Sequence, residues 1–359
     1  MRATPIQGAA GLKVLELSAG LAGAYAGLIL RAQGAEVTLS SAGLKRDLDE
    51  FERAYYDRGK ALAERDWRTL RDEADVVVCD FPLACLRELA LPLTLDELQA
   101  GAVAVYITPF GLMGPHSSFA STDITEWAAG GLAYVSRRGV PESDGPGYSP
   151  VLAPGRQPEV LAGIAGASAA LFGCLHAEMT GEAVIADVSR QEVQAAMLHG
   201  VVPPFVWNSV VPGAPASRVS IGMLVPAADG LFYLRPVEAH HWDALYRWMG
   251  NPDWTAEPWA SDSMSRQQQM PLITELVGLW AAQFPRQKLL VDGQAHHVPV
   301  ALPRSIDDVL ESGHLRERDF WQPVTVGGKE ALGPAIPMLD PCSWSCAPVA
   351  GVAAAVGGA

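Results

Sequence analysis

The stretch LKVLELSAGLAG, residues 12–23, decides how the first part of the chain folds. Its apolar run, residues 12–17, predicts a short strand, and a turn of small residues then leads into a helix rich in Ala, Leu and Gly. The helix ends near Gly34, and residues 35–40 predict a second strand. The order strand, helix, strand is typical of a βαβ unit in a parallel sheet.

Further apolar segments continue this pattern. Residues 74–80, 102–108 and 183–188 predict strands, and a long helix runs from Pro158 to a stop at Thr180-Gly181. We therefore expect a Rossmann-like α/β large domain whose parallel sheet is covered on both faces. Breaks rich in Pro and Gly are predicted at 139–158 and 202–213, and the Trp-rich part beyond them predicts a smaller α+β domain. In this smaller domain we expect a strand at 231–236 and helices at 242–249, 272–284 and 306–310.

The composition narrows the classes of function. The chain has 359 residues, 49% hydrophobic and 18% charged, which is enough to bury a large core. Its 40 acidic residues against 26 basic ones give a formal charge of −14, which disfavours nucleic acid and anionic membranes as partners. Five scattered cysteines and an N-terminus without a signal-peptide core lead us to expect a cytoplasmic protein.

Two kinds of motif could indicate a cofactor or metal site, and neither is specific. Residues 18–23, SAGLAG, are a near match to the GxGxxG turn of dinucleotide-binding domains. NAD is disfavoured because Ser40-Ser41 stands where an acid would hold the ribose, and small residues for helix packing explain the turn about as well. The pairs His240-His241 and His296-His297 and the residues Cys342 and Cys346 do not form a convergent ligand set, so we expect no metal site.

Glu159 is the candidate for chemistry. It follows Pro158 at the start of the long apolar helix, where the helix dipole favours a carboxylate. The local residues leave two interpretations open: an acid that only suits a helix start, which they favour, and an ionised carboxylate that attacks a thioester carbonyl.

Several stretches, taken in order, resemble the class III (CaiB/BaiF-type) CoA-transferase family, which includes formyl-CoA transferase, carnitine CoA-transferase and the α-methylacyl-CoA racemases. The segments that carry the resemblance are GLKVLEL at 11–17, GAEV at 34–37, DRGK at 57–60, ADVVVCDF at 74–81, FGLMGP at 110–115, TGE and DVSRQE within 180–192, and HVPVA and HLRERDF within 297–320. The resemblance implies a large domain over 1–200, a small domain over 201–324 and a C-terminal segment, 325–359, that returns to the large domain. It also implies an interlocked dimer, either a homodimer or a heterodimer with a sister subunit.

The same resemblance implies the site. Glu159 falls where the family's transferases place a catalytic aspartate, and Thr122 stands in place of the racemases' histidine, which disfavours racemisation. CoA and its acyl thioester are expected as substrates, with no tightly bound cofactor. The residues carried over as CoA-binding are Ser18, Ala22, Gly23, Arg58, Lys60, Asp80, Phe81, Phe110 and Gly111. Backbone N–H groups near the helix start are expected to hold the oxyanion.

The implied function is transfer of CoA from an acyl-CoA to a carboxylic acid through an anhydride and a glutamyl-CoA thioester. Four departures from the family weaken it: Glu159 for aspartate, Ser40-Ser41 for the acid and arginine after the second strand, Asp80 for asparagine, and no GGG run in the loop expected between 210 and 228. They leave open a non-catalytic partner subunit of a hetero-oligomeric transferase and, with less support, an acyl-CoA lyase or hydrolase.

Overall fold

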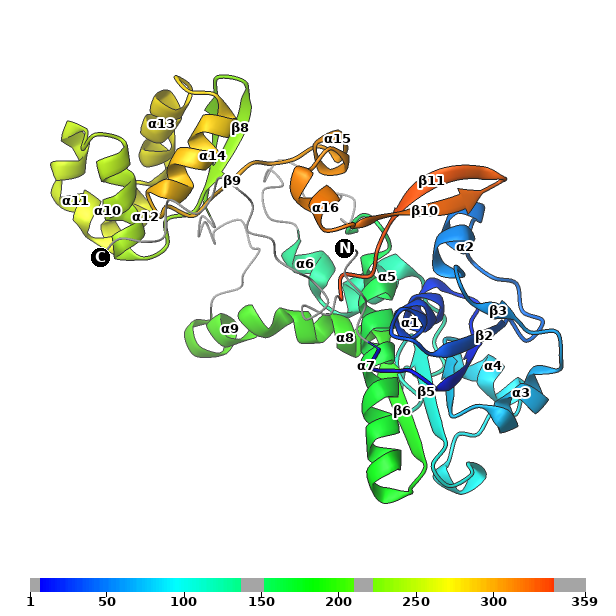
Figure 1. Ribbon diagram of the computed structural model, residues 1–359. Helices are drawn as coiled ribbons and strands as arrows, with labels where there is room; N and C mark the ends of the chain where they lie inside the picture. The colour runs from blue at the N-terminus through cyan, green and yellow to red at the C-terminus, as the bar shows by residue number, and fades with distance from the viewer. Residues whose placement is uncertain (1–6, 137–151, 210–221, 339–359) are drawn as a thin grey trace. The chain divides into compact units, whose positions relative to one another are not determined.

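The computed structural model describes residues 7–136, 152–209 and 222–338 (Figure 1). The chain divides into two compact units. Among the described residues, the large unit comprises 7–136, 152–209 and 317–338, and the small unit comprises 222–316. The sequence-based limits of 200 and 324 are limits of folding domains and stay a prediction.

A six-stranded parallel sheet in the order β3-β2-β1-β4-β5-β6 forms the centre of the large unit. This is the strand order of a doubly wound nucleotide-binding sheet, so the expected Rossmann-like fold is confirmed. The strands are β1 (Lys13–Leu17), β2 (Glu36–Ser40), β3 (Ala61–Leu62), β4 (Val76–Cys79), β5 (Val103–Thr108) and β6 (Val184–Ser189). The helices are α1 (Leu21–Ala32), α2 (Glu50–Tyr56), α3 (Trp67–Glu73), α4 (Leu83–Glu88), η1 (Leu95–Glu97), α5 (Asp123–Ala129), α6 (Leu132–Val135), α7 (Gln157–Thr180), α8 (Arg190–Ala196), η3 (Met197–Gly200) and α9 (Val202–Asn208).

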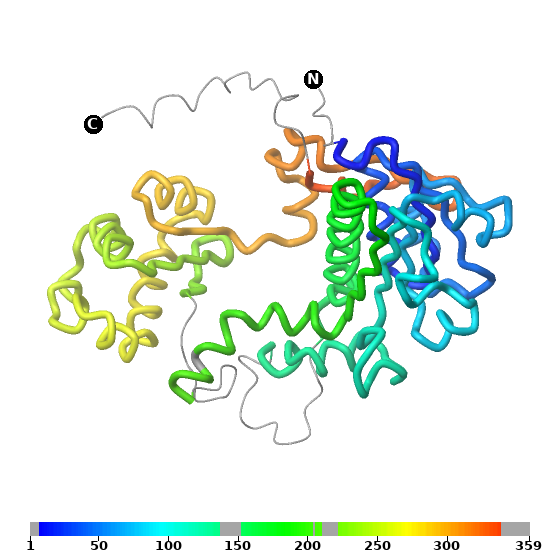
Figure 2. The backbone as a smooth tube through the Cα atoms, turned by 90° about the horizontal axis from the view of Figure 1, so that it is seen from below, coloured from blue at the N-terminus to red at the C-terminus, as the bar shows by residue number. Residues whose placement is uncertain are grey.

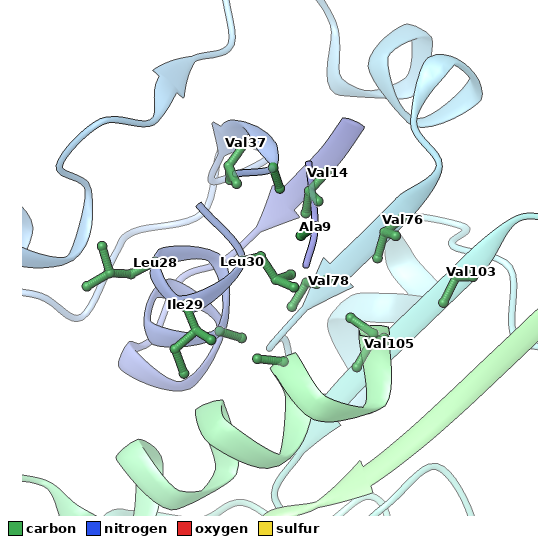
Figure 3. Packing of buried hydrophobic residues seen from close by; sticks show 14 of the residues in the cluster. Ala9, Val14, Leu28, Ile29, Leu30, Val37, Val76, Val78, Val103 and Val105 are labelled. Atoms are coloured by element: carbon green, nitrogen blue, oxygen red, sulfur yellow. The ribbon is translucent and has the colours of Figure 1, made fainter. Parts of the chain in front are cut away.

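Apolar side chains on both faces of the sheet hold these layers together. Figure 3 shows valines of β1, β4 and β5, Val14, Val76, Val78, Val103 and Val105, gathered beneath α1 and α7. Alternate residues of the same strands point the other way and pack among residues of α3 and α4. Burial on both faces explains why these strands are continuous apolar runs in the sequence.

Helix α7 supports the candidate site. It begins at Gln157, one residue before the predicted start, and ends at Thr180; the C-cap residue Gly181 has a φ of +75°, which suits glycine. Figures 1 and 2 both show α7 alongside the strands, and its small residues let it approach α1 closely. A Cβ atom on Gly163 would lie 2.7 Å from the carbonyl oxygen of Ala22. Among the described helices, α7 alone is long and apolar enough to cross a membrane. One side of it packs in the core, whereas Ile164, Phe172, Leu175 and Met179 are exposed.

Two other segments complete the large unit. The segment predicted as a break at 202–213 begins with α9, because prolines 203 and 204 occupy the first turn, where a helix needs no N–H donor. The hairpin β10 (Trp321–Val326) and β11 (Lys329–Pro334) lies against α2. Arg58 donates to the carbonyl oxygen of Pro334 at 3.0 Å.

The small unit has its own sheet and core. The antiparallel order is β7-β8-β9, and Phe232, Trp242 and Leu245 are among the side chains buried beneath helices. Its elements are β7 (Met223–Ala227), β8 (Gly230–Leu234), α10 (Ala239–Trp248), η4 (Asp253–Ala256), α11 (Pro258–Ser261), α12 (Ser263–Gln268), α13 (Met270–Ala281), α14 (Arg286–Ala295), β9 (Val300–Ala301), α15 (Ile306–Leu310) and α16 (Gly313–Glu317), of which α16 reaches the boundary between the units.

Candidate active site

The carboxyl edge of the parallel sheet brings the candidate residues together. Gly20 follows β1, Asp80 follows β4 and Arg190 follows β6, so all three lie at this edge. Helix α7 leads back to β6 and runs opposite to the strands, so its first turn, with Glu159, lies at the same edge. A Cβ atom on Gly20 would lie 3.0 Å from Asp80 Oδ2 and 3.5 Å from Glu159 Oε1.

Two arginines hold the carboxylate of Glu159, which is 5% exposed. Arg156 Nε donates to Oε2 at 2.5 Å, and an Arg190 terminal nitrogen donates to Oε1 at 3.2 Å. Arg156 is the residue before α7 and has a left-handed backbone, φ +52°. This unusual conformation for a non-glycine residue accompanies a side chain that turns back onto the first helical turn.

Burial sets the acidity of this carboxyl group. Desolvation raises the pKa of Glu159 to about 7, although Arg156 and Arg190 act in the opposite direction. The pKa of Asp123, on α5, is also raised by burial. A carboxyl group whose pKa lies near neutrality, inside the protein at the edge of a Rossmann-like sheet, is a candidate for chemistry.

Each arginine has acidic partners besides Glu159. Arg156 donates to Asp47 Oδ2 at 3.1 Å and to Glu52 Oε2 at 3.2 Å. Arg190 pairs with Glu126 Oε1 at 2.7 Å, and Glu126 is fully buried on α5. Ser121 Oγ donates to the same oxygen of Glu126 at 2.5 Å. The first turn of α7 therefore lies in a network of alternating acids and guanidinium groups.

Asp80 lies beside this network, and its carboxylate caps the start of α1. Its carboxylate accepts hydrogen bonds from the backbone N–H groups of Ala19 at 2.9 Å, Gly20 at 3.1 Å and Gly23 at 2.9 Å. The turn that the sequence suggested for a nucleotide phosphate thus surrounds a carboxylate of the chain itself. Ser18 and Ala22 are buried in this turn, and Ser18 Oγ donates to Glu16.

Lys60 and Phe81, both expected to contact CoA, are buried inside the large unit. The ammonium group of Lys60 pairs with Glu16 Oε2 at 2.6 Å, and the two side chains are 1% and 0% exposed. It also donates to the carbonyl oxygen of Ala24 at 2.7 Å. Phe81 is fully buried in the core on the α4 side of the sheet. Both side chains have partners inside the protein, and their assignment to CoA stays a prediction.

Arg58, Phe110 and Gly111 lie elsewhere on the large unit. The guanidinium of Arg58 stacks over Tyr55 at 4.1 Å. The ring of Phe110 makes edge contacts with His116 and Phe119 in the loop after β5. Gly111 has φ +86°, a backbone conformation that favours glycine. Among the described contacts, none joins these three residues to Glu159, and their assignment to CoA stays a prediction.

The arginines and Glu126 were missed in the sequence. Arg156 had a signal, since an arginine three residues before Glu159 can fold back on a helix start. Arg190 had a weaker one, because it follows a strand predicted to end at the same edge. Glu126 had no signal in the sequence. Thr122, which stands where the racemases have a histidine, is the N-cap of α5 and forms a capping box with Thr125. Among the described residues no three His, Cys, Asp or Glu side chains form a metal site, and Cys342 and Cys346 lie outside the described residues.

Comparison with known proteins identifies the family of this chain. The sequence model "CoA-transferase family III" matches residues 58–350. The chain is 28% identical over 269 residues to the probable CoA-transferase Rv1866 of Mycobacterium tuberculosis, covering 71% of this chain and 33% of that protein, so it spans about a third of that relative's length. It is 24% identical over 332 residues to the succinyl-CoA–D-citramalate CoA-transferase of Chloroflexus aurantiacus, covering 86% of this chain and 81% of that protein.

A third relative is a subunit of an assembly. The chain is 24% identical to subunit BbsE of the succinyl-CoA:(R)-benzylsuccinate CoA-transferase of Thauera aromatica, covering 75% of this chain and 68% of that protein. Two solved structures share the fold: Rv3272 of Mycobacterium tuberculosis, with a TM-score of 0.78, 22% identity and 93% of each chain covered, and a CaiB/BaiF family protein of Brucella suis, with a TM-score of 0.70, 20% identity, and 94% of this chain and 97% of that one covered. The family model covers most of the sequence, and the chain therefore belongs to CoA-transferase family III.

Proposed function

We propose that this chain transfers CoA from an acyl-CoA thioester to a carboxylic acid, with Glu159 as the nucleophile. The observation that carries the proposal is the carboxylate of Glu159, buried at the carboxyl edge of the sheet and held by two guanidinium groups. Membership of the family and relatives named as CoA-transferases support the reaction class.

The proposed cycle has two halves, and in each half an anhydride with Glu159 forms and is cleaved by the CoA thiolate. Glu159 attacks the thioester carbonyl, the C–S bond breaks, and CoA leaves as a thiolate while a mixed anhydride forms. The thiolate then attacks the glutamyl carbonyl, which releases the donor acid and leaves a glutamyl-CoA thioester. The acceptor carboxylate attacks the carbonyl carbon of that thioester, the C–S bond breaks, and CoA leaves again as a thiolate while a second anhydride forms. The thiolate attacks the acceptor's carbonyl, which yields the new acyl-CoA and restores Glu159.

The arginine pair fits a glutamate at this position. Glutamate carries its carboxyl group one methylene further out than aspartate, and a displacement of about 1 Å in a reacting group costs about 100-fold in rate. Arg156 and Arg190 fix both oxygens of the longer side chain, so the chain has its own means of positioning the carboxylate.

Oxyanion stabilisation differs from the expectation. The N–H groups of Glu159 and Val160 bond to the carbonyl oxygen of Arg156, and three N–H groups at the start of α1 bond to Asp80. In the proposed reaction the developing negative charge therefore faces the guanidinium groups of Arg156 and Arg190 in place of those amides.

A second candidate is a partner subunit that supports a catalytic sister chain. Two observations favour it. The ammonium group of Lys60 pairs with Glu16 inside the protein, and backbone N–H groups at the start of α1 bond to Asp80. Neither the ammonium group nor these N–H groups are then free to bind the phosphates of CoA. The relative BbsE is named as a subunit. On this hypothesis the isolated chain binds CoA poorly and shows no transfer until its sister chain is added.

A trapping experiment tests the proposal. The purified chain is incubated with an acyl-CoA and hydroxylamine, and peptides containing Glu159 are searched by mass spectrometry for a hydroxamate. We expect modification at Glu159 in the wild type and none in Glu159→Gln, with Glu192→Gln as a control because Glu192 is an exposed acid on α8. Bound acyl-CoA, shown by calorimetry, without modification would refute the nucleophile. CoA release without an acceptor acid would indicate a hydrolase.

A further inference from the structure

Arg190 joins two acids that come from different helices. It begins α8, and its side chain is 15% exposed. One terminal nitrogen lies 2.7 Å from Glu126 Oε1 and the other lies 3.2 Å from Glu159 Oε1. The shorter contact is with Glu126, so Arg190 is held more closely by its partner on α5 than by the candidate nucleophile.

The two oxygens of Glu159 are not equivalent. Oε2 accepts a charge-assisted hydrogen bond from Arg156 at 2.5 Å. Oε1 has the longer contact with Arg190 and faces Gly20, the N-cap residue of α1, where an added Cβ atom would lie 3.5 Å from it. Releasing Oε1 costs less than releasing Oε2, because longer ionic contacts are weaker. Oε1 is therefore the oxygen placed to react.

Acylation changes the charge of this network. When Oε1 bonds to the thioester carbonyl carbon, the negative charge of Glu159 leaves with the CoA thiolate and the anhydride is neutral. Arg156 still has Asp47 and Glu52 at 3.1 and 3.2 Å. Arg190 has Glu126 as its remaining acidic partner among the described ion pairs. Without Glu126, a largely buried guanidinium would be left unpaired, which is costly.

We propose that Glu126 is a positioning residue that keeps Arg190 paired while Glu159 is acylated through Oε1. This inference rests on the proposed function of Glu159. Glu126 is suited to the task because it is fully buried, receives the hydroxyl of Ser121 on the oxygen that meets Arg190, and has no hydrogen-bond partner for Oε2 in the described structure. It touches no reacting atom and acts through Arg190.

Several other charged groups around Glu159 also influence the pKa of its carboxyl group. They are Arg156 before α7, Asp47 and Glu52 around Arg156, Asp123 and Glu126 on α5, Arg190 on α8 and Asp80 after β4. The acids outnumber the two arginines, so removing one acid leaves the arginines' charge acting more strongly on Glu159.

The variant Glu126→Gln tests the proposal, and Glu192→Gln is the matched control. We expect the single-turnover rate of trapping at Glu159 to fall at least about tenfold, which is about 1.4 kcal/mol. Acyl-CoA affinity should stay within about twofold, because Glu126 touches no atom of the thioester in this proposal. The pH midpoint of trapping should move down, because Arg190 then acts on Glu159 alone. A purely structural role would lower thermal stability without moving that midpoint. An unchanged rate and midpoint in a folded Glu126→Gln would overturn the proposal.

A double-mutant cycle keeps the test independent of folding defects. If Glu126 acts through Arg190, then Glu126→Gln has little further effect in the Arg190→Met background, whereas independent roles would add. Glu126→Asp, which keeps the charge, should recover part of the rate. Additive losses, or no recovery by aspartate, would count against the assignment.

The failure of this inference is distinguishable from the failure of the proposed function. If the wild-type chain forms no adduct with saturating acyl-CoA, transfer by Glu159 is wrong. The link between the residues is still measurable by carbon-13 NMR of glutamate carboxyl groups, with Glu159 assigned through Glu159→Gln. A downward shift of its titration midpoint in Glu126→Gln supports the link through Arg190, and an unchanged midpoint refutes it.

Discussion

Replacing Lys60 by methionine tests whether this residue serves the fold or a ligand. In the structure Lys60 Nζ lies 2.6 Å from Glu16 Oε2, inside the protein, and 2.7 Å from the carbonyl oxygen of Ala24. A methionine side chain keeps most of the volume and removes the charge. Glu16 is then left as a buried acid without its cation.

The expected loss follows from burial. Removing one partner of a buried ion pair destabilises a protein by about 3–5 kcal/mol, because the other charge stays buried without compensation. A typical domain has about 5–15 kcal/mol of stability in total, so the loss is a large part of it. An exposed lysine carries no such penalty, and surface substitutions usually change stability by less than about 0.5 kcal/mol.

Urea unfolding followed by circular dichroism measures this loss. Lys45→Met is the control, because Lys45 is exposed. The double variant Glu16→Met/Lys60→Met should regain most of the stability, since both charges are then gone. If Lys60→Met unfolds like the wild type while its affinity for CoA falls about tenfold or more, a loss of about 1.4 kcal/mol of binding, Lys60 is a ligand residue and its structural assignment is wrong.

The pH dependence gives a second check with a defined sign. Burial already raises the pKa of Glu16 in the wild type, against the effect of Lys60. Without Lys60 that pKa rises further, so the folded variant binds a proton that the unfolded chain, with a glutamate pKa of about 4.3, releases. Stability of Lys60→Met should therefore fall as the pH rises from the unfolded pKa through the folded one. A deficit that is the same at acidic and alkaline pH would contradict this account.

Three other outcomes are expected. The rate of trapping at Glu159 should rise with pH through about 7, because the ionised carboxylate is the nucleophile. Mass spectrometry of the adduct at several pH values measures this rate. A rate that titrates near the ordinary glutamate pKa would contradict the effect of burial. Asp80→Asn should destabilise the chain by about 1–3 kcal/mol in urea unfolding, because three N–H groups lose a charged acceptor, and an unchanged midpoint would argue against it. Gly163→Ala should cost about 1–3 kcal/mol despite the better helix propensity of alanine, since the new methyl group meets the backbone of α1, whereas Ser168→Ala on the exposed face of α7 should be neutral.

Most of the fold was predictable because periodicity and strand order depend on local composition. The buried strands are short apolar runs, and the ends of α7 follow from Pro158 and Gly181. Helix α9 was missed because two prolines suggested a break, although both lie in a first turn. The short strand β3 was missed as well, since an exposed Ala-Leu pair carries no pattern.

The site was less predictable because its partners meet only in the folded chain. Glu159 was identified from its place before an apolar helix and from the family resemblance. Arg190 and Glu126 are separated from it by 31 and 33 residues in sequence, as their residue numbers show. Arg190 has only its place after a predicted strand to mark it, and nothing in the local context of Glu126 does. Lys60 was assigned to a ligand because DRGK at 57–60 resembles a family segment. Its burial depends on Glu16, an acid inside an apolar strand whose partner the sequence does not name.

The position of Asp80 explains why this Rossmann-like order does not imply a dinucleotide. In such a sheet a phosphate binds at the switch point between β1 and β4, against the N–H groups that begin α1. Here Asp80 comes from the end of β4 itself and accepts three of those N–H groups. A phosphate would have to displace a covalently attached, largely buried carboxylate of the same charge sign, and the residues directly after β2, 41–43, include no acid to hold a ribose. The same carboxylate fixes the turn at Gly20, which borders Glu159 Oε1. The first turn of α1 therefore contributes to the position of the candidate nucleophile, and the anion that its amides bind is part of the chain.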